Sequence, residues 1–214
     1  MACCDSDDCP SSRDSNSPRW PQALWIALAI NAGFFLIEIA AGVAAGSVSL
    51  QADALDFLGD SANYAISLAV AGMALSWRAR ASLAKGATMA AFGLWILAST
   101  AYNAFAGIVP DAPVMGIVGA FALVANVIVA VMLYRFRDGD SNMRSVWICS
   151  RNDAIGNVAV MLAAFGVFGT GSGWPDLVVG GLMSALGLQG AWTVAKHARE
   201  ELRTERRVHL SPAE

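Results

Sequence analysis

Apolar residues gather along this chain in long runs separated by short polar segments, a pattern typical of proteins that cross a membrane several times. A helix that crosses the hydrocarbon core of a bilayer needs about 20 predominantly apolar residues. The runs that reach this length are 22–45, 48–76, 84–107, 112–134, 145–168 and 174–195. We therefore expect an all-α integral membrane protein with six transmembrane helices.

Turn-forming residues separate these runs. Glycine, proline and small polar residues favour turns and end helices. They mark breaks at 46–47, 110–113, 138–142 and 169–175, and an arginine-containing break is expected at 77–80. The connections are too short to form domains.

The basic residues lie on one side of the expected bilayer. All 14 Lys and Arg residues occur in the N-terminal segment, the second and fourth connections (with Arg151 just inside the fifth helix) and the C-terminal tail. Basic connections face the cytoplasm. Both termini are therefore expected to be cytoplasmic, with the protein in the inner (cytoplasmic) membrane, and an even number of spans follows independently of hydropathy.

The composition agrees with this organisation and excludes an ordinary soluble domain. Hydrophobic residues make up 56% of the chain and charged residues only 14%, whereas soluble domains carry about 25% charged residues. We expect a disordered cytoplasmic arm rich in Cys and Asp at 1–20, a six-helix transmembrane domain at 21–197 and a short cytoplasmic tail at 198–214 that continues the last helix for a turn or two. The distribution of the basic residues is explained by their position on the cytoplasmic side of the membrane, so it indicates no nucleic-acid partner.

Three aspartates, Asp53, Asp56 and Asp60, interrupt the second apolar run at spacings that place them on one face of a helix. A carboxylate at the centre of a span costs about 2.5–3.5 kcal/mol on insertion scales. From the sequence, no basic residue is expected at that depth to pair with them. The cost of these carboxylates therefore indicates a functional cation site.

The fifth run offers a second set of polar residues, in which Cys149, Asp153 and Asn157 form one stripe at four-residue spacing. The second and fifth helices enter from opposite sides, so Asp56, Asp60 and Asp153 meet near the middle of a core about 30 Å thick. Three carboxylates and a thiol suit tetrahedral Zn²⁺ or Cd²⁺ better than Mg²⁺ or Ca²⁺. Burial and like charge favour protonated carboxyls in the empty site, so metal and protons compete for it.

Three motifs carry these residues in a fixed order. They are Asn31…Glu38…Gly42 in the first run, Gly46-Ser-Val-Ser-Leu-Gln-Ala-Asp-Ala-Leu-Asp-Phe-Leu-Gly-Asp60 in the second, and Cys149-Ser-Arg-Asn-Asp-Ala-Ile-Gly-Asn157 in the fifth. In this order, and over all six helices, the chain resembles the cation diffusion facilitator family of metal-ion/proton antiporters. The resemblance implies a cation-efflux-type bundle in a homodimer, with no permanent cofactor, that exchanges a cytoplasmic divalent cation, usually zinc, for protons. It places the transport site at Asp56, Asp60, Cys149 and Asp153.

The chain departs from the family pattern in three ways. Histidine is usual at the first position of each ligand pair, whereas Asp56 and Cys149 stand there in this chain. The aspartate variant occurs in members that handle iron, zinc or cadmium, so Co²⁺ and Fe²⁺ join Zn²⁺ and Cd²⁺ as candidate cargo. The family's cytoplasmic C-terminal metal-binding domain is expected to be missing because the chain ends soon after the sixth helix, and a dimer must then be held within the membrane.

Four further polar residues lie near the expected site with alternatives left open. Asp53 either guides ions in the exit vestibule or favours the N-terminus of its helix through the helix dipole. Glu38 either supports the ligands or carries protons, or it only bonds a neighbouring helix. Asn31 and Asn157 belong to the same group of residues that support the ligands or line the vestibule.

The N-terminal arm contains three thiols, Cys3, Cys4 and Cys9, among aspartates. The spacing does not match a structural zinc site, which needs two separated pairs of ligands. The arm either captures a soft metal near the inner entrance or carries reduced, unstructured thiols.

The expected function is secondary active export of a metal cation, which confers metal tolerance. A channel or uniporter indifferent to pH, or a membrane metal sensor, would keep the same ligands and is the alternative. The alternative for the aspartates is a purely structural role, as protonated carboxyls that form hydrogen bonds to neighbouring helices. The alternative for Cys149 is that it is a small buried hydrophobic residue. A metalloenzyme is disfavoured because the first histidine is His197.

Overall fold

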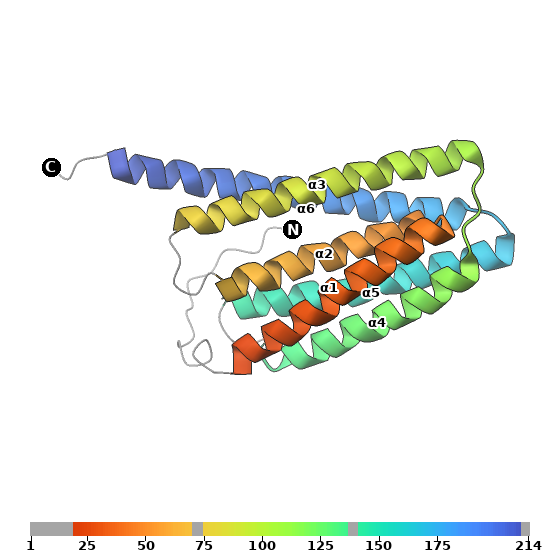
Figure 1. Ribbon diagram of the computed structural model, residues 1–214, viewed down its shortest axis with the longest axis horizontal. Helices are drawn as coiled ribbons and strands as arrows, with labels where there is room; N and C mark the ends of the chain where they lie inside the picture. Colours follow the sequence, from red (N-terminus) through yellow and green to blue (C-terminus); the bar gives the residue numbers. More distant parts are fainter. Residues whose placement is uncertain (1–18, 70–74, 137–140, 211–214) are drawn as a thin grey trace.

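The computed structural model describes residues 19–69, 75–136 and 141–210, and the regular structure within these ranges is helical throughout. The helices lie along one elongated bundle (Figure 1). They are α1 (Arg19–Ala45), α2 (Val48–Ala69), α3 (Leu75–Ala106), α4 (Ala112–Tyr134), α5 (Ser141–Thr170) and α6 (Trp174–Leu210). The prediction of an all-α protein with six helices is confirmed.

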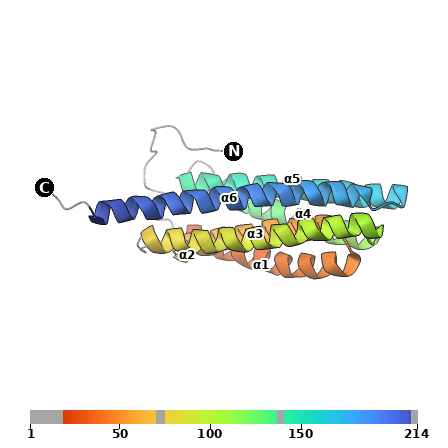
Figure 2. The same cartoon turned by 90° about the horizontal axis from the view of Figure 1, so that it is seen from above.

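The helices pack as pairs around α2. The closest pairs are α3 with α6, α1 with α2 and α4 with α5, and α2 also contacts α3, α5 and α6. Seen from above, α5 and α6 lie on one side of the bundle and α1 lies on the other (Figure 2). Because α2 touches four other helices, it is the central helix, and its first eight residues are all buried.

The two ends of the bundle differ in composition. The start of α1 and the end of α6 lie at one end, here called the terminal end, and the turns after α1, α3 and α5 lie at the other, here called the turn end (Figure 1). Apart from Lys85 and Arg151, which lie ten residues inside α3 and α5, the basic residues of the described ranges occur near the starts of α1, α3 and α5 and near the ends of α4 and α6. Up-and-down connectivity therefore gathers them at the terminal end, as the orientation inferred from the sequence requires.

Five of these helices are long and apolar enough to cross a membrane by length and composition. They are α1 and α4 in full, and the segments Arg80–Ala106, Asp153–Thr170 and Trp174–Glu200 of α3, α5 and α6. The protein is therefore a multi-pass membrane protein. The second helix is long enough at 22 residues, but its three aspartates set it apart from the other helices. Four neighbouring helices pack against it.

The predicted breaks at the turn end are confirmed. Gly46 and Gly171 have φ values of 68° and 62°, in the left-handed region that glycine adopts without a steric penalty and that commonly ends helices. The fourth helix starts after Asp111, whose side chain accepts a hydrogen bond from the Val114 amide at 3.1 Å. This is an ordinary N-cap.

The predicted boundaries at the terminal end were wrong in two places. The third helix begins at Leu75 and runs through the expected break at 77–80, and α6 continues to Leu210, further than the one or two turns expected of the tail. In both places the residues are mainly Ala, Arg, Glu and Leu, which are strong helix formers despite their charge. The bounds of the transmembrane domain stay a prediction. Residues 1–18 of the expected arm, with Cys3, Cys4 and Cys9, and residues 211–214 of the tail lie outside the described residues.

Gly180 allows α6 to approach α2 closely. A Cβ atom at this position would lie 2.7 Å from Val48 Cγ2, 2.8 Å from the Val48 carbonyl carbon and 2.9 Å from the Ser49 amide nitrogen. We expect Gly180→Ala to lower the free energy of unfolding by about 1–3 kcal/mol, because the two helices must separate. Thermal unfolding in detergent measures this effect.

The matched control is Gly190→Ala on the same helix, where nothing lies within 4 Å of the added atom. It should leave the unfolding temperature unchanged or raise it, since alanine favours a helix interior over glycine by up to about 1 kcal/mol. Equal unfolding temperatures for the two variants would contradict the close approach.

Candidate metal-binding site

Asp60 begins a chain of hydrogen bonds that joins α2 to α5. Its Oδ2 atom accepts a hydrogen bond of 2.9 Å from the hydroxyl of Tyr64, one turn further along α2. The same hydroxyl lies 2.8 Å from Ser150 Oγ on α5. The side chains of Asp60, Tyr64 and Ser150 are all buried, so these bonds fix the position of the Asp60 carboxyl between the two helices.

Asp153 meets Asp60 from the opposite helix. The two carboxyl groups lie within hydrogen-bonding reach of each other, and Asp153 is half-buried on α5. Ser150 and Asp153 are three residues apart and therefore share a helix face. Two of the four expected ligands are thus brought together across the α2–α5 contact.

The other two expected ligands are placed less completely. Asp56 is half-buried one turn before Asp60, and its carboxyl interacts electrostatically with those of Asp53 and Asp60. Cys149 lies in α5, but its side chain is outside the described part of the chain. Among the side chains that are described, three or more His, Cys, Asp or Glu residues do not converge into a metal-sized group. The four-ligand site stays a prediction.

A second polar cluster lies closer to the turn end. Glu38 of α1 and Asp53 of α2 are buried, with exposed fractions of 0% and 1%, and their carboxyl groups lie within hydrogen-bonding reach of each other. Asn157 of α5 donates to Asp53 Oδ1 at 3.1 Å. Asn126 of α4 donates to the side-chain oxygen of Asn157 at 3.5 Å. Helices α1, α2, α4 and α5 therefore each contribute one polar residue to this cluster.

Of the two asparagines expected near the site, Asn157 contacts a carboxyl side chain, that of Asp53. Asn31 is buried, but its side-chain amide donates to the Ala27 carbonyl of its own helix at 2.9 Å. Glu38 and Asn31 are seven residues apart, about 10 Å along a helix, which places Asn31 towards the terminal end.

Lys85 is a residue that the sequence reasoning missed. Its ammonium group donates a hydrogen bond to Asn63 Oδ1, and its charge acts on Asp60, three residues earlier in α2. The expectation that no basic residue lies at the depth of the aspartates therefore does not hold. Lys85 reaches this depth because α3 starts earlier than expected, so that Lys85 stands within the helix instead of in a connection.

Asp176, in the first turn of α6, holds the N-terminus of a different helix. Its Oδ2 accepts from the Val48 amide at 2.8 Å, and its Oδ1 accepts from the Ser49 amide at 3.0 Å. The hydroxyls of Ser47 and Ser49 also donate to Oδ1, at 2.7 and 2.6 Å. Asp176 is 1% exposed. Asp176 thus caps α2 and ties it to α6 at the turn end.

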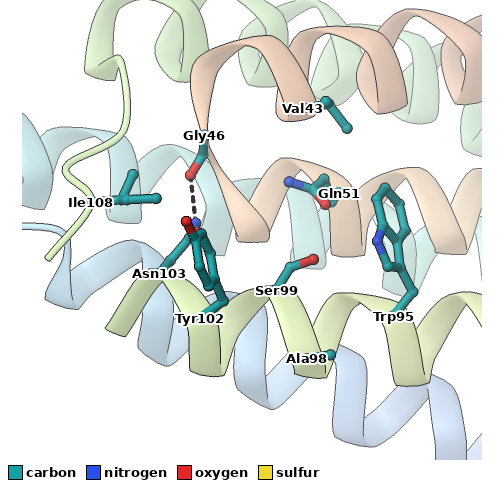
Figure 3. A pocket seen from close by; sticks show the side chains of 9 residues that line it. All are labelled: Val43, Gly46, Gln51, Trp95, Ala98, Ser99, Tyr102, Asn103 and Ile108. Carbon is teal, nitrogen blue, oxygen red and sulfur yellow. Dashed lines mark hydrogen bonds between the residues drawn. The ribbon is translucent and has the colours of Figure 1, made fainter. Parts of the chain in front are cut away.

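A pocket at the turn end is separate from the carboxyl groups. It is lined by residues of α1, α2 and α3, among them Gln51, Trp95 and Tyr102, and Asn103 closes one side by donating to the Gly46 carbonyl at 2.9 Å (Figure 3). Gln51 and Asp53 leave α2 about 200° apart, since successive residues are about 100° apart around a helix. The pocket therefore lies on the side of α2 that faces away from Asp53.

A multi-pass helical bundle with carboxyl groups buried between its second and fifth helices is the class of protein that the fold and site define. Residues 24–203 match the model of the cation efflux transmembrane domain. The match covers most of the chain, which therefore belongs to the cation efflux family.

Similar proteins include the zinc transporter ZitB of Yersinia pestis, 31% identical over 208 residues, and that of Escherichia coli K12, 27% identical over 216 residues. The alignments cover 89% and 94% of this chain. They cover 64% and 67% of the two relatives, so the chain spans about two thirds of the length of the proteins that it matches.

Proposed function

We propose that this protein exports a divalent metal cation from the cytoplasm in exchange for protons, with Zn²⁺ and Cd²⁺ as the preferred cargo and Co²⁺ or Fe²⁺ as further candidates. The observation that carries the proposal is the contact between the Asp60 and Asp153 carboxyls, buried between two helices of a membrane bundle. A divalent cation or protons must offset the charge of this pair. Membership of the cation efflux family and similarity to proteins named zinc transporters support the same function.

In this proposal Asp56, Asp60, Cys149 and Asp153 ligate the transported ion. Tyr64 holds the Asp60 carboxyl in place, and Lys85 supplies a positive charge at the side of the site that faces the terminal end. A charge in this position lowers the cost of the carboxylates when the metal is absent. We also propose that the protein is a homodimer in the inner membrane. Measuring the mass of the protein in lipid nanodiscs tests the oligomeric state.

The decisive experiment is metal uptake into proteoliposomes under an imposed pH gradient, with Zn²⁺, Cd²⁺, Co²⁺ and Mn²⁺ compared. Uptake of zinc or cadmium that follows the direction and size of the gradient is the expected result. Uptake indifferent to pH would identify a channel or uniporter. Metal binding without uptake of any ion would identify a sensor.

Replacing Tyr64 with phenylalanine should weaken zinc binding about 10- to 100-fold, the usual cost of removing a group that orients a metal ligand. The change removes only the hydroxyl that bonds Asp60 and Ser150, and it leaves the ring in the core. Calorimetric titration with zinc measures the effect. The control is Tyr102→Phe, because Tyr102 is 67% exposed and lies at the separate pocket. Equal affinities for the two variants would remove Tyr64 from the site.

Replacing Cys149 with histidine should shift the transported ion from cadmium towards zinc, since a thiolate is the softer ligand. The ratio of cadmium to zinc uptake in proteoliposomes measures the shift. An unchanged ratio would show that Cys149 does not ligate the ion.

A further inference from the structure

Glu38 is a buried acid that the proposed metal site leaves unused. Neither of its carboxyl oxygens has a hydrogen-bond donor among the described residues, and the same holds for Asp53 Oδ2. Buried polar groups normally have such partners, and exceptions are concentrated at functional positions. The Asp53 carboxyl within reach of Glu38 is itself an acceptor when ionised.

A bound proton would supply the donor that these carboxyl oxygens lack. Two carboxylates in contact repel each other, whereas one proton between them converts the contact into an O–H···O hydrogen bond. The other polar and charged groups around the pair do not supply a positive charge that could replace the proton. Asp56 of α2 adds negative charge, Asn157 of α5 and Asn126 of α4 are neutral, and Lys85 lies with Asn63 towards the terminal end.

Asn157 connects the pair to the helix segment that carries the metal site. Its side-chain amide donates to Asp53 Oδ1 at 3.1 Å and also to the backbone carbonyl of Asp153 at 3.2 Å. A single residue, Asn157, therefore links the Asp53 carboxyl to the part of α5 that positions Asp153. A change in the protonation of the pair alters the acceptor strength of Asp53 and, through Asn157, the environment of this segment.

We propose that Glu38 and Asp53 form a proton-binding site, distinct from the metal ligands, which carries one of the protons exchanged for metal. This inference rests on the proposed antiport. The site takes a proton from water on one side of the membrane and releases it to water on the other, and no other bond is made or broken. Metal and proton then occupy separate groups that communicate through Asn157.

The first test observes the proton directly in the purified full chain without metal. The infrared C=O band of protonated carboxyl groups should lose one component in Glu38→Gln, because the amide then donates to Asp53 without needing a shared proton. Asp111→Asn, at an exposed N-cap, should leave the band unchanged. An unchanged band in Glu38→Gln would overturn the proposal, whatever the transport results.

The second test uses proteoliposomes. Glu38→Gln should keep zinc exchange at equal pH within about threefold of the unmodified protein, while its acceleration by a pH gradient falls about tenfold, as expected when one coupled site is removed. Glu38→Asp, which keeps a carboxyl, should recover much of the response to the gradient. A full response in Glu38→Gln would overturn the proposal.

Zinc titration separates the remaining outcomes. Glu38→Gln should bind zinc with the stoichiometry of the unmodified protein. Loss of one bound zinc would make the pair a metal site and would also overturn the proposal. If the unmodified protein itself shows no flux driven by the gradient, the antiport function fails, and the infrared comparison still decides whether the pair holds a proton.

Discussion

Zinc uptake driven by a pH gradient should fall at least about a hundredfold in Asp60→Asn, the largest loss of activity that we expect from any single substitution. Asparagine has the size of aspartate and still offers an oxygen to the Tyr64 hydroxyl, so the hydrogen bonds that join α2 to α5 are preserved. The negative charge that faces Asp153 is lost. The ion thereby loses an anionic ligand, because a neutral amide oxygen binds a divalent cation more weakly than a carboxylate does.

The measurement is uptake of radioactive zinc into proteoliposomes, normalised to the amount of inserted protein. Asp153→Ala should give the same loss from the other side of the contact. Asp111→Asn is the matched control, because it removes the charge of an exposed aspartate at the turn end. Normal uptake in purified Asp60→Asn would exclude Asp60 as a ligand of the transported ion.

The largest effect on stability should come from Asp176→Ala. The Asp176 carboxyl is buried and accepts hydrogen bonds from two amides and two hydroxyls at the start of α2. Removing it leaves the Val48 and Ser49 amides without this acceptor in a buried site. We expect the free energy of unfolding to fall by about 3–5 kcal/mol, because each buried donor left without an acceptor costs about 1–3 kcal/mol.

Asp111→Ala separates this effect from ordinary capping. Both aspartates cap a helix, but Asp111 is exposed and accepts one backbone amide of its own helix, so its loss should cost about 0.5–2 kcal/mol. Thermal unfolding of the two variants in the same detergent gives the comparison. If both unfold at the same temperature, burial of Asp176 does not contribute to stability.

Hydropathy predicted the helices well because the bilayer imposes a minimum apolar length on each of them, and glycine, proline and small polar residues located the turns. It failed at the start of α3 and the end of α6. There the helix leaves the apolar region, and charged residues such as Arg80 and Arg203 continue it because they are good helix formers. Helix propensity and membrane depth are separate properties, and only the second is measured by hydropathy.

The candidate site was predicted in part. Spacing alone placed Asp53, Asp56 and Asp60 on one face, but Asp53 and Asp60 are seven residues apart, about 10 Å along the helix. They consequently meet different partners, Glu38 in one case and Asp153 in the other.

Three residues that form hydrogen bonds with groups of α2 were not predicted from the sequence, and only one of them could have been found from a local sequence pattern. Tyr64 follows Asp60 by four residues, a spacing that local analysis can recognise. Lys85 and Asp176 come from other helices and are brought to α2 only by the packing of the bundle. A local pattern in the sequence carries no information about such contacts.

The central position of α2 has a consequence for how the chain enters the membrane during synthesis. Three aspartates oppose insertion of this helix, by at most about 9 kcal/mol on translocon scales if all three lay at the centre of the span and met lipid alone. Its neighbours α1, α3, α5 and α6 shield it in the finished bundle, but α3, α5 and α6 are made later. The nascent helix therefore depends first on its hairpin with α1. Biogenesis, and not only transport, constrains the surface that α1 offers to these acids.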